Sequence, residues 1–228
     1  IIYAVGLNLI LGVAGQFSLG HAGFIAIGSY SGAILGKMMN GLPGLFAGMA
    51  VGVLISVVIA FLVGLPTLRL KGDYLAIATL GVAEIIRVAV TNMKITNGAA
   101  GISGVPLTNT WTITYIALVV TTILILNYTF SSAGRATYAV LQDEIAAESM
   151  GVQVTKYKIL AFVLGAATAS IGGTLSATTL GAVTPSDFTF MKSIDVLIIV
   201  VFGGIGSFTG SFVAAVLLGI INLVLQPF

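Results

Sequence analysis

The residues best suited to chemistry in this sequence are Glu84 and Arg87, which stand three positions apart. On a helix, that spacing places them on one face, where opposite charges pair. Ionisable residues inside an apolar helix usually face protein or water. The pair therefore either neutralises itself and steadies helix contacts, or lines a translocation route or an outer gate. His21 could relay protons, but a lone histidine among glycines is more often a hydrogen-bonded packing residue.

Catalytic and metal chemistry find little support in the sequence. The chain has no cysteine, so it can form neither a disulfide nor a thiolate metal site, and one histidine cannot build a histidine-rich zinc site. No Gly-x-x-x-x-Gly-Lys-Ser/Thr run is present, so the chain lacks that ATP-binding motif. We therefore expect no catalytic residue, no metal, no cofactor and no enzyme activity.

The composition is typical of an integral membrane protein. Of 228 residues, 7% are charged and 58% are hydrophobic, and the mean hydropathy is +1.15. A soluble domain carries about 25% charged residues. The net charge of +2 is too small for a surface that binds nucleic acid. A soluble enzyme and a nucleic-acid-binding protein are thereby excluded, and the lipid bilayer is the expected surrounding.

Continuous apolar runs of about 20 residues predict membrane-spanning helices rather than barrel strands. Candidate runs are residues 1–15, 45–65, 74–93, 111–130, 157–183 and 212–225. Residues 17–36 and 193–210 form two further runs that glycines interrupt. The sequence thus predicts an all-α, polytopic transmembrane helical bundle with broken or re-entrant helices, in one domain over residues 1–228. Because the chain opens with Ile1 inside a hydrophobic run, we expect that at least one earlier helix is missing.

The two glycine-interrupted runs contain candidates for a translocation path. Broken helices at matching places in two halves often mark a transporter's pathway, and the segment at 15–20 loosely echoes the one at 206–210. Close packing of helices through small residues would explain the same glycines, so both interpretations stay open. The path candidates are Gln16, Ser18, His21, Glu84, Arg87, Gly203 and Gly204.

Residues 131–158, called the connector below, lie between two expected spans. Tyr138, Leu141 and Ile145 recur at helical spacing and predict one short amphipathic helix, which Gly151 would end in a left-handed conformation. The helix is either a solvated link or a docking element for a partner. The positive-inside rule places the connector in the cytoplasm. Its basic residues Arg135, Lys156 and Lys158 then lie inside with Arg69 and Lys71, while Lys37, Lys94 and Lys192 lie outside.

Several stretches together make the chain resemble the permeases of bacterial branched-chain amino-acid ABC importers, of the LivH/LivM type and closer to LivM. The stretches are GQFSLGHAGF at 15–24, RLKGDYLAIATL at 69–80, GAAGISG at 98–104, residues 135–151, KILAF at 158–162 and GGIGS at 203–207. Members of that family are usually longer at both ends, so the resemblance implies a chain truncated at both ends.

The resemblance implies a permease subunit of the bacterial inner membrane that moves branched-chain amino acids and hydrolyses no ATP itself. Its implied partners are a LivH-like permease subunit in a heterodimer, two ATP-binding cassette ATPases and a periplasmic substrate-binding protein. An ABC permease for urea or other amino acids remains an alternative. An ion-coupled secondary transporter, with Glu84 and His21 as coupling groups, and a membrane scaffold are further alternatives.

In such importers the connector would be the coupling loop, with the pattern Glu-Ala-Ala-x-x-x-Gly. The Ala-Ala-x-x-x-Gly part is present, but Ile145 stands where the acid is expected, and Glu144 lies one residue earlier. Small alanines would allow close approach to an ATPase, so a bulky charge at Ala147 should uncouple transport without disturbing the membrane fold. The residues implied in ATPase coupling are Arg135, Leu141, Glu144, Ala146, Ala147 and Gly151.

Overall fold

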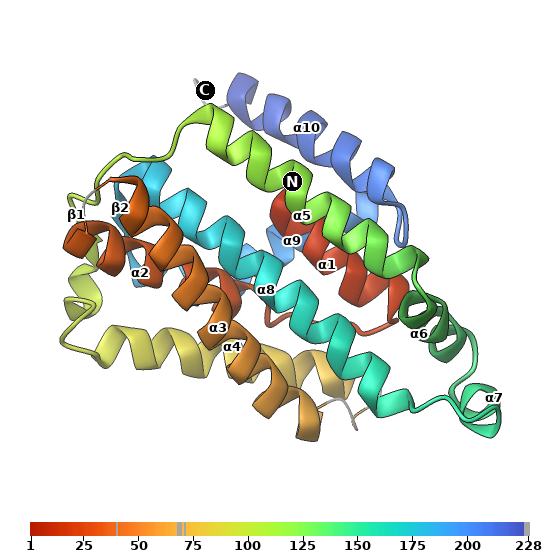
Figure 1. Cartoon of the computed structure of the whole chain (residues 1–228). Helices are drawn as coiled ribbons and strands as arrows, with labels where there is room; N and C mark the ends of the chain where they lie inside the picture. The colour runs from red at the N-terminus through yellow and green to blue at the C-terminus, as the bar shows by residue number, and fades with distance from the viewer. Residues whose placement is uncertain (40, 68–69, 71, 226–228) are drawn as a thin grey trace.

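A computed structural model describes residues 1–39, 41–67, 70 and 72–225. Apart from two short strands its regular structure is helical, and the helices form a bundle (Figure 1). The longer helices are α1 (Ile2–Asn8), α2 (His21–Met39), α3 (Leu42–Thr67), α4 (Asp73–Asn92), α5 (Trp111–Phe130), α6 (Ser132–Gln142), α7 (Glu144–Ser149), α8 (Val154–Leu180), α9 (Phe190–Gly203) and α10 (Phe208–Leu225). The short elements are η1 (Leu9–Val13), η2 (Gly98–Ala100), β1 (Ile102–Ser103), β2 (Ala182–Val183) and η3 (Pro185–Phe188).

The membrane-spanning pattern agrees with the sequence. Within the described residues, α3, α4, α5 and α8 are long and apolar enough to cross a membrane. The α9–α10 pair is bent by 119° at a short interruption between the two helices, and it forms either a fifth, broken span or a re-entrant loop. The predicted all-α polytopic bundle with broken helices is therefore confirmed. The bounds of α5 coincide with the predicted run because Thr110 and Ser131 on either side have extended backbone.

The run predicted over residues 1–15 is helical from Ile2 to Val13 and is one of the shorter apolar helices. α1 is seven residues long, and the π-helix η1 continues it for five more. Gly15 then takes φ +66°, and residues 15–20, called the break below, carry no regular structure before α2 begins at His21. Glycine reaches that left-handed backbone without steric penalty. The break therefore separates two helices, and the run predicted at 17–36 begins inside it.

The centre of the bundle consists of α2, α3 and α8. Glycines bring their backbones into contact: a Cβ at Gly28 would lie 2.0 Å from the Ser170 carbonyl oxygen of α8. Between α2 and α8, the rings of Phe24 and Phe162 pack edge to face with their centroids 5.7 Å apart. Close approach through small residues is how membrane helices gain contact area, so many of the glycines serve packing.

The two ends of the bundle carry different elements. α6 and α7 lie at one end, and the β1–β2 pair lies at the other (Figure 1). At the β1–β2 end, Lys37 Nζ donates to the Ser103 carbonyl oxygen over 2.8 Å. Residues 97–104 at this end form a turn-rich loop, since Asn97, Gly98, Gly101 and Gly104 all have positive φ. The predicted internal residues Arg69 and Lys71 lie outside the described residues.

Candidate functional site

The connector forms two helices, not the single amphipathic helix predicted. Asp143 has extended backbone between α6 and α7, and its Oδ1 accepts hydrogen bonds from the amides of Ile145 at 2.9 Å and Ala146 at 3.1 Å. A side-chain acceptor of this kind satisfies the first amides of a new helix. The chain therefore starts α7 at Glu144. Arg135 in α6 is exposed and donates from Nη1 to the Phe130 carbonyl oxygen over 3.1 Å.

The change of direction at Asp143 alters which connector residues are exposed. Ile145 is 77% exposed instead of lying on the predicted apolar stripe, and Met150 is 85% exposed. Ala146 is exposed between them, and these three residues are called the tip. Ala147 is only 5% exposed, so a bulky charge there is expected to disturb the packing of α7 as well as any docking. Gly151 does adopt the predicted left-handed conformation, with φ +81°.

The connector is joined to the break by one polar and one apolar contact. Glu144 of α7 forms an ion pair with Lys158 near the start of α8. The carbonyl oxygen of Lys158 accepts a hydrogen bond from Gln16 Nε2 in the break, at 3.0 Å. Leu141 of α6 lies over Gly15, where a Cβ would be 2.4 Å from the Leu141 Cδ1. A displacement of the connector would therefore act directly on the break.

The break and the first turn of α2 in turn hold two further helices, α4 and α9. The Leu19 amide donates to Thr79 Oγ1 of α4 over 3.1 Å, and the Ala22 amide at the start of α2 donates to Ser193 Oγ of α9 over 2.9 Å. Ser18 stays local, since its Oγ accepts from the Gly20 amide at 3.3 Å. The sequence had not indicated Thr79 or Ser193 as partners of the break.

His21 is buried, as expected of a packing residue, and the backbone of Tyr3 is the hydrogen-bonding group next to its ring. His21 stands at the first position of α2, directly after the break. The structure thus brings Gln16, Ser18 and His21 together along one buried segment.

The second interruption, between α9 and α10, is held by Asn8 of α1. Asn8 Nδ2 donates to the Ser207 carbonyl oxygen and to Ser211 Oγ, each over 2.9 Å, and its Oδ1 accepts from the Gly206 amide at 2.8 Å. Asn8 is fully buried, and sequence reasoning missed it. A single amide side chain in an apolar run could have indicated Asn8, because a buried polar group needs a hydrogen-bond partner.

The predicted path residues Gly203 and Gly204 lie at this interruption. A Cβ at Gly203 would be 2.5 Å from Ser211 Cα, and Gly204 has φ +92°. The amide of Gly206 would lie 2.3 Å from a Cβ on Gly12, the residue near the end of η1. The loop after α9 therefore packs against η1 just before the break, so the two interruptions are neighbours in space.

Glu84 and Arg87 form the predicted ion pair on α4. Arg87 Nε donates to both carboxylate oxygens of Glu84, at 3.0 Å and 2.9 Å, and Nη2 donates to Oε1. Both side chains are partly exposed, whereas Thr79 on the same helix is buried against the break. The structure therefore divides the path candidates into a buried group at the two interruptions and an exposed pair on α4.

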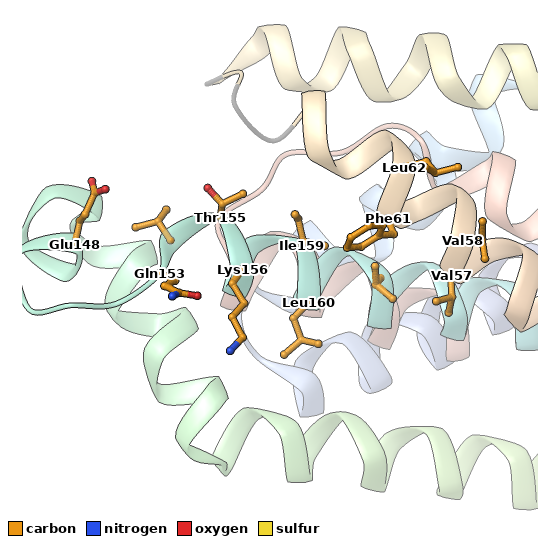
Figure 2. A pocket seen from close by; sticks show the side chains of 12 residues that line it. Val57, Val58, Phe61, Leu62, Glu148, Gln153, Thr155, Lys156, Ile159 and Leu160 are labelled. Carbon is orange, nitrogen blue, oxygen red and sulfur yellow. The ribbon is translucent and has the colours of Figure 1, made fainter.

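Two hollows in the surface lie near these residues. A groove of about 850 Å³ runs between α3 and α8 at the connector end, where Phe61 and Val58 face Ile159 and Leu160 (Figure 2). A pocket of about 320 Å³ at the other end is lined by Asp187, Lys192 and Asp195 together with Tyr3, Ser29 and Ser176. The charged side chains of Asp187, Lys192 and Asp195 are thus gathered around one pocket. The groove walls are mostly apolar, and Glu148 and Lys156 lie at its connector end.

Comparison with known proteins identifies relatives of the whole chain. Residues 1–228 match a family described as "Branched-chain amino acid transport system / permease component". The chain is 37% identical over 263 residues to the high-affinity branched-chain amino acid transport system permease protein LivM of Salmonella typhimurium, and 36% identical to that of Escherichia coli K12. Each alignment covers 100% of this chain. The LivH permease protein of Salmonella typhimurium is 25% identical over 95% of this chain and 78% of its own length.

The chain spans 61% of the length of the LivM proteins that it matches. No solved structure matches it significantly.

Proposed function

The chain belongs to the branched-chain amino acid transport permease family, and on that premise we propose that it is the membrane-spanning permease subunit of an ATP-driven importer of branched-chain amino acids. The protein is a multi-pass membrane protein with four to five candidate spans among its described residues. The LivM and LivH relatives are all permease proteins of branched-chain amino acid transport, which supports the substrate class.

The proposed assembly contains a LivH-like permease subunit, two ATP-binding cassette ATPases and a periplasmic substrate-binding protein, in a bacterial inner membrane. Similarity to both LivM and LivH proteins supports a pair of related permease subunits. In this assembly the chain itself carries out no ATP hydrolysis, and its part is to convert movement of an attached motor into alternating access.

The tip is the proposed contact with the ATPases. Ile145 and Met150 are large apolar side chains that are more than three-quarters exposed at the end of the bundle. A large apolar residue exposed on a short helix is typical of a protein-protein contact when polar residues surround it. α7 is six residues long and is too short to be stable alone, so the Asp143 cap and buried Ala147 hold it for docking.

The observation that carries the proposal is the continuous set of contacts from the connector to the break and on to α4 and α9. Glu144 reaches Lys158, the Lys158 carbonyl reaches Gln16, and Leu141 packs on Gly15. From the break and the first turn of α2, hydrogen bonds reach α4 through Thr79 and α9 through Ser193. A push on the tip would therefore move the segment that separates α1 from α2, together with the helices attached to it.

The tip is tested by Ile145→Ser/Met150→Ser in the reconstituted complex. Loss of the apolar contact should lower both ATPase binding and ATP-driven leucine uptake about tenfold or more, which corresponds to about 1.4 kcal/mol of binding free energy. Thermal unfolding of the purified chain should not change, because both side chains are already exposed.

A matched control is Met38→Ser, which removes an apolar side chain of 74% exposure next to Lys37, at the β1–β2 end of the bundle. The control should leave ATPase binding unchanged. Equal ATPase binding by the tip variant and the parent would contradict the docking role.

A further inference from the structure

One face of α4 is unusual for a helix at the edge of a membrane bundle. Glu84 lies about 16 Å along the helix axis from Asp73 and about 12 Å from Asn92, at about 1.5 Å per residue. That position is deep inside a hydrocarbon layer of about 30 Å. Ile77, Gly81, Glu84, Ile85 and Val88 share this face by helical spacing. We call these five residues and Arg87 the polar face of α4.

The polar face differs from the other exposed helix faces. α3, α5 and α10 contain no Asp, Glu, Lys or Arg within their bounds. The exposed side chains of α5 that repeat along its length, such as Ile116, Val120 and Leu124, suit contact with lipid. Charged groups at membrane depth face protein or a water-filled cavity instead. The polar face of α4 is therefore covered by something other than lipid.

The ion pair indicates that this face of α4 meets water or a polar ligand rather than an apolar protein surface. Arg87 uses Nε and Nη2 on Glu84, and its Nη1 donates to no group in the part of the chain that the structure describes. Guanidinium has five donors, so most of them remain available. A buried ion pair is stabilising only when its remaining donors and acceptors are also satisfied. Water or a polar ligand satisfies them, whereas an apolar partner surface does not.

The surroundings of the pair suit a small zwitterion with an aliphatic side chain. A Cβ added at Gly81 would meet nothing within 4 Å, so there is open space one turn before Glu84. Ile77, Ile85 and Val88 offer exposed apolar surface next to it. Arginine binds carboxylates through two parallel donors, and a carboxylate such as Glu84 keeps free lone pairs for an ammonium group.

We propose that the polar face of α4 lines the translocation route and binds the charged end of the transported amino acid. The α-carboxylate is held by the free edge of the Arg87 guanidinium, and the α-ammonium is held by Glu84. The aliphatic side chain lies against Ile85 and Val88. This inference rests on the proposed function, and it adds a substrate site that the buried interruptions do not provide.

Single cysteines test the proposal, since the chain has none of its own. Ile85→Cys, or Val88→Cys one turn further along the face, is placed in the complete complex with cysteine-free partner subunits in lipid nanodiscs. The thiol is reacted with a charged methanethiosulfonate in nucleotide-free and nucleotide-trapped states. Leu124→Cys on α5 is the matched control, because Leu124 is 60% and Ile85 is 69% exposed in the chain alone.

We expect the α4 cysteine to react in at least one nucleotide state and the α5 control to react in neither. Saturating leucine should slow the α4 reaction about tenfold, as mass action predicts at about nine times the dissociation constant. 4-Methylpentanoate and 3-methylbutylamine, each with one charge of leucine removed, should not slow it at the same concentration.

Each of the other possible results contradicts one step of the proposal or the proposed function itself. Reaction that leucine does not slow, or that the single-charge analogues slow equally, contradicts recognition of a zwitterion and leaves the proposed function standing. No reaction at either α4 position contradicts a water-filled route along this face. Absence of ATP-driven leucine uptake by the parent complex, measured on the same preparation, contradicts the proposed function itself.

Discussion

Replacing Asn8 by Leu should destabilise the protein through the turn between α9 and α10. The side chain makes three hydrogen bonds to that turn and to Ser211 while fully buried. A hydrogen bond is worth about 0.6 kcal/mol on average in a membrane protein and up to about 1.5 kcal/mol in general. Three lost bonds therefore lower the free energy of unfolding by about 2–4.5 kcal/mol. At about 2–4 °C per kcal/mol for this size of chain, the midpoint should fall by about 4–18 °C.

Thermal unfolding of the purified chain in lipid nanodiscs measures the effect, and Ser211→Ala is the graded control. That variant removes one acceptor of the Asn8 amide and leaves the two bonds to backbone groups. It should therefore lower the free energy of unfolding by about 0.6–1.5 kcal/mol. An Asn8→Leu variant that unfolds at the wild-type midpoint, or no lower than Ser211→Ala, would refute the assignment of Asn8 as the residue that holds the turn.

The remaining predictions concern the connector and the bundle centre. Ala147→Asp should lower the yield of folded protein because Ala147 is buried, whereas Ala146→Asp should fold normally and weaken ATPase binding; equal folding yields for the two would contradict the burial. Asp143→Ala should remove the N-cap of α7, which is worth about 1 kcal/mol, and the amide hydrogens of that helix should then exchange faster. Unchanged exchange would exclude a capping role. Gly28→Ala should separate α2 from α8 and lower the unfolding midpoint, whereas Gly219→Ala, where a Cβ meets nothing within 4 Å, should leave it unchanged or higher.

The long helices could be predicted from the sequence because their signal is local. α5 consists of twenty residues with interfacial aromatics near its ends, and no charged residue interrupts it. The ion pair of Glu84 with Arg87 was equally local, since three residues along a helix fix the geometry. Predictions of this kind need no knowledge of what packs against the helix.

The connector and the break could not be predicted, because their conformations depend on single side chains and distant partners. The apolar stripe continued past Asp143, but the Asp143 carboxylate offers the backbone a helix cap, and capping prevailed over the stripe. The break and the first turn of α2 are held by Thr79 and Ser193, which are 60 and 171 residues away from their partners. Hydroxyl groups of this kind are common in membrane helices, so nothing in the sequence distinguishes these two.

Single glycines show the same limit of prediction from the sequence. Gly15 and Gly28 lie 13 residues apart in glycine-rich sequence, yet Gly15 turns the chain with a positive φ and Gly28 brings two helices together. The packing interpretation therefore applies to Gly28, whereas Gly15 interrupts the helix. The distinction lies in backbone conformation and in what faces the residue, and neither is contained in the residue type.

The most direct test of the account is leucine uptake by the complex reconstituted in vesicles, measured in turn with ATP and with an imposed proton or sodium gradient. The account predicts uptake that requires ATP together with the ATPase subunits and that falls when the Ile145 and Met150 side chains of the tip are removed. Uptake by the chain without ATPases, or uptake driven by an ion gradient in the absence of ATP, would contradict it.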